Sequence, residues 1–208
     1  MTTTPNPAPL SSTLGITMTS SKLLEDFKYL RGHCIDLVHA YFTYTRLFND
    51  KNRDLLTKVA PTFFSDIADI MLRDWLLQVC KLMDPPSTTR KGVTIENITI
   101  KLINEQLTDN KLLSLEIEDL ANKLLIYGEK IKPARDKRLA HFDRDHQVNG
   151  LVLGATTESE LDQFLVNLQK YCDEVGIAIG LGPLDFGRGG CKGDVLDFLK
   201  YLRKMQNA

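Results

Sequence analysis

Long stretches whose apolar residues recur every three or four positions constrain the fold of this chain most. Such spacing lines up apolar side chains along one side of an α-helix. The stretches are residues 20–48, 62–83 and 114–142, with shorter ones at 158–175 and 194–205. Long helices joined by short connections predict an all-α fold, an up-and-down helical bundle of about five to six helices.

Residues that start or stop helices divide the pattern. Ser20 and Ser114 suit helix N-caps, and Asn97 to Thr99 suits the start of a short helix that ends near Leu107. Asp84-Pro85-Pro86 stops the second long helix, because proline cannot continue the hydrogen-bond ladder. Pro133 predicts a kink or break just before Arg135. Residues 93–100 alternate weakly, and their flanks favour a loop that leads into a helix.

The chain is expected to form one domain. Residues 1–19 have the Thr/Pro/Ser composition of a flexible tail, and residues 20–208 follow as a single helical unit. Within it, the glycine-rich segment 176–193 is expected to be a connector or lid. A phosphate-binding loop is disfavoured there, because no strand pattern precedes it and Cys191-Lys192-Gly193 lacks the Lys-Ser/Thr ending.

Composition limits the partners, the metal sites and the cellular compartment to be expected for this chain. The formal net charge is −1, so an anionic partner needs a local basic patch. The four cysteines lie far apart without C-x-x-C spacing, which disfavours disulfides and zinc and favours a reducing compartment. His33 and His39 fall on different helix faces, so no metal site is expected. Since we find no secretory signal and no membrane-spanning stretch, we expect a cytoplasmic protein.

One basic cluster stands out. Residues 130–138 hold five positive side chains and one negative, a local charge of +4, and His141 follows closely. Basic side chains neutralise phosphates, and histidine exchanges protons near neutral pH. Cations in the last turn of a helix also complement its dipole, which is a purely structural explanation. Because Arg135 and His141 lie about 120° apart around a helix axis, the spacing leaves open which cation partners His141.

The residues around this cluster resemble a known family. Arg135-Asp136-Lys137, Ala140-His141 and Asp143 form the pattern R-D-K-x-x-A-H-x-D. It is similar to the signature of the HEPN superfamily, an arginine and a polar residue followed by a histidine. Its local form resembles the AbiU-like branch, which is associated with phage abortive infection. Cys80 to Pro85 and the Asn97 to Ile100 join also resemble that branch.

The resemblance implies a fold and an activity. Members of the superfamily are helical bundles that commonly dimerise, and the active ones are ribonucleases that need no metal or other cofactor. His141 would be the general acid/base, Arg135 would stabilise the phosphate in the transition state, and Asp136 would orient one of them. The motif would be assembled across two chains, so the angle between Arg135 and His141 matters less.

The resemblance also implies partners. Four further cations would hold the RNA backbone: Lys132, Lys137, Arg138 and Arg144. The expected partners are RNA, a second copy of the chain and, in a toxin–antitoxin context, a cognate antitoxin. Two alternatives stay open: a non-catalytic module that binds RNA or a nucleotide, and a dimeric scaffold.

Overall fold

The computed structural model describes residues 20–136, 156–187 and 190–206. These residues form seven α-helices and one two-stranded hairpin. In chain order the elements are α1 (Ser21–Leu47), α2 (Asp50–Val59), α3 (Pro61–Met83), β1 (Ser87–Arg90), β2 (Val93–Glu96), α4 (Ile100–Asp109), α5 (Leu115–Ala134), α7 (Glu158–Ala178) and α8 (Val195–Gln206). The expected all-α class is confirmed. The tail predicted for residues 1–19 lies outside the described residues.

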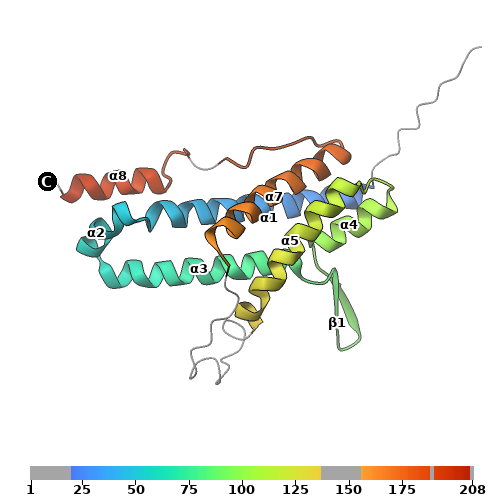
Figure 1. The fold of residues 1–208 in the computed structure, drawn as a ribbon, viewed down its shortest axis with the longest axis horizontal. Helices are drawn as coiled ribbons and strands as arrows, with labels where there is room; N and C mark the ends of the chain where they lie inside the picture. Colours follow the sequence, from blue (N-terminus) through green and yellow to red (C-terminus); the bar gives the residue numbers. More distant parts are fainter. Residues whose placement is uncertain (1–19, 137–155, 188–189, 207–208) are drawn as a thin grey trace, which may run out of the picture.

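The helices form an elongated bundle (Figure 1). α1, α3 and α8 run along its length, α2 turns the chain from α1 back to α3, and α5 packs along α7. None of the helices in the described ranges is long and apolar enough to cross a membrane.

Side-chain caps fix where most helices begin. The Ser20 hydroxyl accepts a hydrogen bond from the Leu23 amide, and Thr99 and Ser114 cap α4 and α5 in the same way. Asn49 caps α2, a short helix that apolar spacing alone did not predict. Such caps satisfy amide groups that have no partner inside the helix.

Two apolar clusters hold the bundle together. The larger one joins α1, α3, α4, α5 and α7 around fully buried side chains such as Phe27, Leu124 and Leu168. It includes the buried cysteines Cys34, Cys80 and Cys172. The smaller cluster packs α8 against the joint between α1, α2 and α3. Trp75 packs against Tyr41 and Phe164.

A β-hairpin replaces the loop expected after Pro86. Ser87–Arg90 pairs with Val93–Glu96 in antiparallel register, and the hairpin projects from the bundle (Figure 1). Lys91 and Gly92 form its two-residue turn with φ values of 50° and 77°. Two residues with positive φ match the twist of the flanking strands, so this turn closes a hairpin even though its strands are short.

The glycine-rich segment is packed over much of its length. Gln169 Nε2 donates to the Leu184 carbonyl at 2.7 Å, and His39 Nε2 lies 2.7 Å from the Phe186 carbonyl oxygen. Phe186 itself is buried. A loose connector therefore does not describe residues 181–187, which are held against α1 and α7. Arg188 and Gly189 lie outside the described residues.

Replacing Gly176 should destabilise this packing. A Cβ atom on Gly176 would stand 2.4 Å from the Gly182 carbonyl oxygen, a backbone atom with little room to move. We expect Gly176→Ala to lower the free energy of unfolding by about 1–3 kcal/mol, as overpacking typically does. Urea denaturation followed by circular dichroism measures this change.

Gly32 in α1 provides the matched control for that experiment. A Cβ atom there meets nothing within 4 Å, so Gly32→Ala removes only the entropic cost of a helical glycine. It should raise the free energy of unfolding by up to about 1 kcal/mol. A Gly176→Ala protein as stable as wild type would contradict the steric argument.

Candidate functional site

Arg135 lies where α5 ends. Pro133 is inside the last turn, and the helix stops at Ala134. The Arg135 amide donates to the carbonyls of both Ile131 and Lys132, so the hydrogen-bond ladder loses its regular spacing here. Where a kink or break was predicted, the α-helix changes to a π-helical turn at Arg135 and Asp136, and proline explains this irregularity because its missing N–H interrupts the ladder.

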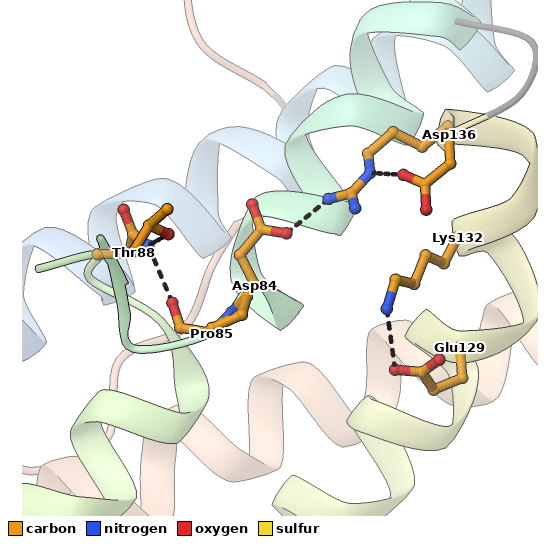
Figure 2. A network of polar contacts seen from close by, with 8 residues as sticks. Asp84, Pro85, Thr88, Glu129, Lys132 and Asp136 are labelled. Atoms are coloured by element: carbon orange, nitrogen blue, oxygen red, sulfur yellow. Dashed lines mark hydrogen bonds and ion pairs between the residues drawn. The ribbon is translucent and has the colours of Figure 1, made fainter. Parts of the chain in front are cut away.

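Two carboxylates hold the Arg135 side chain. Its Nη1 donates to Asp84 Oδ1 at 2.5 Å, and its Nε donates to Asp136 Oδ1 at 2.7 Å. Asp84 comes from the C-terminal end of α3, directly before the two prolines. In Figure 2 Asp84 faces the end of α5, with Lys132 in the last turn of that helix and Asp136 just beyond it. The guanidinium thus bridges the ends of two helices that are 51 positions apart in the chain.

The two contacts fix both the charge and the orientation of Arg135. Partial burial alone lowers the pKa of the guanidinium, but the hydrogen bonds and charges of Asp84 and Asp136 outweigh it and raise the pKa above its usual value. A guanidinium carries five N–H donors, and these contacts use two of them. The side chain is 22% exposed, so it is held in place and still accessible from one side.

A cavity of about 240 Å³ opens beside Arg135. Apolar and charged residues line it together: Cys80, Met83, Asp84, Pro85, Lys101, Gly128, Glu129, Lys132 and Arg135. Gly128 allows α5 to approach α3 closely, because a Cβ atom there would lie 2.5 Å from Met83 Cγ. Burial raises the pKa of the Cys80 thiol to about 11, so the thiol is protonated at neutral pH and is a poor nucleophile.

Acidic partners neutralise much of the basic cluster found in the sequence. Lys130 Nζ donates to Glu160 on α7 at 2.5 Å, and Lys132 Nζ lies 3.8 Å from Glu129 Oε1. Together with the pairing of Arg135, these contacts leave less free positive charge than the sequence suggests. The other residues predicted for the site lie outside the described residues: Lys137, Arg138, His141 and Arg144.

The structure adds two residues that sequence reasoning missed. We interpreted Asp84 only as part of a helix stop, and its pairing with Arg135 leaves no local signal in the sequence. Lys101 follows the start of α4 and reaches the cavity rim, although α4 was predicted without any functional residue. His33 and His39 contact backbone carbonyl oxygens. Within the described ranges no group of three or more metal-binding side chains occurs.

Comparison with known proteins gives one match. A family model named HEPN_AbiU2 and described as AbiU2 matches residues 20–198. The match runs from the start of α1 into α8 and includes Arg135, Asp136 and His141. No curated protein and no solved structure matches the chain significantly.

Proposed function

The chain belongs to the AbiU2 family of HEPN domains, and on this basis we propose that it is a metal-independent endoribonuclease of the cytoplasm. We place it in phage defence by abortive infection or in a toxin–antitoxin pair, with RNA and a cognate antitoxin as partners. The observation that carries the proposal is the position of Arg135, which two carboxylates hold beside a cavity at a helix end.

The proposed reaction is an attack within the RNA strand. His141 accepts the proton of a ribose 2′-hydroxyl, whose oxygen bonds to the adjacent phosphorus. The bond from phosphorus to the 5′-oxygen breaks, and that oxygen takes up a proton, which leaves a 2′,3′-cyclic phosphate and a 5′-hydroxyl. Arg135 stabilises the negative charge that builds up on the phosphate oxygens. Asp136 orients Arg135 through the contact with Nε.

A metal-free cleavage assay tests this function. We expect the purified protein to cut RNA in the presence of EDTA and to produce 2′,3′-cyclic phosphate ends. An oligonucleotide with a single 2′-deoxyribose at the cut position should resist cleavage there, because the attacking hydroxyl is missing. The all-ribose strand is the control. Cleavage of the deoxy strand at that position would contradict the mechanism.

The proposal includes a homodimer in which two motifs share one cleft. Two large apolar side chains on α3, Phe63 and Ile70, are exposed, and they share one side of the helix because they lie seven positions apart. Helix faces of this kind are often covered by a second subunit. We therefore expect light scattering at micromolar concentration to give twice the 23.5 kDa mass of one chain. A mass of 23.5 kDa would contradict the dimer.

A pair of substitutions locates the interface. Ile70→Glu places a charge on the exposed face of α3 and should shift the measured mass toward that of one chain. Tyr29→Glu is the matched control, because Tyr29 is equally exposed but lies on α1. A mass that does not change in either variant would contradict the α3 interface.

One observation favours a second candidate function, a module that binds RNA or a nucleotide without cutting it. Asp84 and Asp136 hold Arg135 through two of its five N–H donors, and a guanidinium held in this way can bind a phosphate whether or not the strand is cut. RNA retention without cleavage in the EDTA assay, lost in Arg135→Ala, would favour this alternative. If neither cleavage nor retention occurs, a dimeric scaffold becomes the better explanation.

A further inference from the structure

The cavity beside Arg135 combines an apolar floor with a charged rim. Cys80 and Gly128 are buried and Met83 is half-buried, so we assign these lining residues from α3 and α5 to the floor. Lys101 and Lys132 are exposed, so we assign these lining residues from α4 and α5 to the rim. We propose that this cavity binds one nucleotide of the RNA, with the base on the floor and its phosphate at the two lysines. This inference rests on the proposed ribonuclease function and names a substrate site for it.

The volume of the cavity suits a single nucleotide. Its volume of about 240 Å³ is below the roughly 300–1,000 Å³ of pockets that enclose drug-sized ligands, so it holds one small unit of a polymer. The faces of a base are apolar and pack well against the Met83 side chain and the close backbone at Gly128. The open rim leaves room for the strand to enter and leave.

The charges at the rim favour a phosphate. Five ionisable side chains line the cavity besides Cys80, namely Asp84, Lys101, Glu129, Lys132 and Arg135, with a net charge of +1. Among the described residues Lys101 has no carboxylate partner, and Lys132 has only the 3.8 Å contact with Glu129. Lys101 therefore offers a positive charge that no ion pair in the described ranges neutralises, and a phosphate gains most from such a charge.

Glu129 gives the cavity a means to choose between bases. Its carboxylate accepts hydrogen bonds and does not donate them when ionised. Adenine, guanine and cytosine carry an exocyclic amino group that donates, whereas uracil donates only through its ring N3–H, which lies between two carbonyl oxygens that a carboxylate repels. We therefore expect the cavity to favour a base with an amino group over uracil. Arg135 lines the same cavity and belongs to the motif, so this nucleotide lies next to the phosphate that is cut.

Binding of an uncleavable strand tests the lysine contact. A fluorescent 2′-O-methyl oligonucleotide has no free 2′-hydroxyl, so its anisotropy with the full chain in EDTA reports binding alone. Lys101→Gln should weaken binding about 3- to 10-fold. It should also reduce the slope of log affinity against log salt by about 0.7, the value for one phosphate contact on a single strand.

Lys58→Gln is the matched control for this experiment. Lys58 is an exposed lysine on α2, which adjoins the opposite end of α3, so its removal should change neither affinity nor salt slope. A Lys101→Gln protein that binds with the affinity and salt slope of wild type would overturn the proposal. So would an equal loss in both variants.

A base scan tests the floor and Glu129. Abasic sites placed one at a time should weaken binding at one position more than at the others. At that position uracil should bind more weakly than cytosine, and Glu129→Gln should reduce the difference. If an abasic site weakens binding equally at every position of the strand, the proposed base site is wrong.

The two proposals fail separately in these experiments. Binding that depends on Lys101 without any cleavage of all-ribose RNA would support the nucleotide site and contradict the ribonuclease. Cleavage that Lys101→Gln leaves unchanged in both rate and KM would support the ribonuclease and overturn the site.

Discussion

His141→Ala should reduce RNA cleavage about 10²- to 10⁴-fold, the contribution expected of a general acid/base. In the proposed reaction this side chain removes the 2′-hydroxyl proton, and alanine cannot replace it. Binding of the uncleavable strand should stay within about threefold of wild type, since the proton transfer takes place only when bonds change. Single-turnover cleavage beside anisotropy separates the two effects.

The matched control for this prediction is His146→Ala. His146 lies five residues further along the chain, outside the arginine-to-histidine spacing of the motif. The His146→Ala protein should cleave RNA at nearly the wild-type rate. Equal losses in the two variants would indicate that the whole segment, rather than the motif histidine, supports cleavage. Thermal melting and light scattering of both variants check that fold and assembly are retained.

Features carried by local sequence were predictable. The long helices follow from apolar spacing, and Ser20, Thr99 and Ser114 cap helices because their hydroxyls lie next to the first unpaired amides. The irregular helical turn just after Pro133 follows from its missing N–H. The Arg135 to His141 motif was recognisable for the same reason, because all its residues lie within one short stretch.

Other features depend on geometry that apolar spacing does not reveal. The hairpin has exposed strands of four residues, too short and too polar to alternate clearly, and it rests on the positive φ values of Lys91 and Gly92. α2 begins with polar residues after its cap, so its first turn carries no apolar spacing that would predict a helix.

The pairing of Asp84 with Arg135 is the most important feature that the sequence analysis missed. It is a tertiary contact across 51 positions, formed because α3 and α5 pack closely at Gly128 and end side by side. The neutralisation of Lys130 has the same origin, since Glu160 lies on α7. A local charge count therefore overstates the free positive charge, because it omits carboxylates that only folding brings near.

Arg135→Ala should reduce cleavage about 10²- to 10³-fold, the loss typical when a donor that stabilises transition-state charge is removed. Arg135→Lys should remain at least tenfold below wild type. A lysine keeps the charge, but its single ammonium group cannot reproduce the fork that meets Asp84 and Asp136 through separate nitrogens. Single-turnover cleavage rates measure both variants.

The matched control for the arginine is Arg73→Ala. Arg73 lies on α3 in an exposed ion pair with Asp69, so its loss tests the general effect of removing one arginine. It should leave cleavage unchanged and alter stability by less than about 1 kcal/mol. If Arg135→Ala cleaves RNA as fast as Arg73→Ala, Arg135 has no role in the reaction.

The Asp84 contact then shows whether orientation, as well as charge, matters for Arg135. Asp84→Asn keeps an oxygen that accepts from Nη1 but removes the charge, so we expect an intermediate loss of about tenfold in kcat, with KM little changed.

Because Asp84 would act through Arg135, the same substitution should have almost no effect in the Arg135→Ala background. Additive losses in the double variant would mean that Asp84 contributes independently of Arg135. Rescue by Asp84→Glu, which restores the charge on a longer side chain, would then indicate that the negative charge itself is needed at the end of α3.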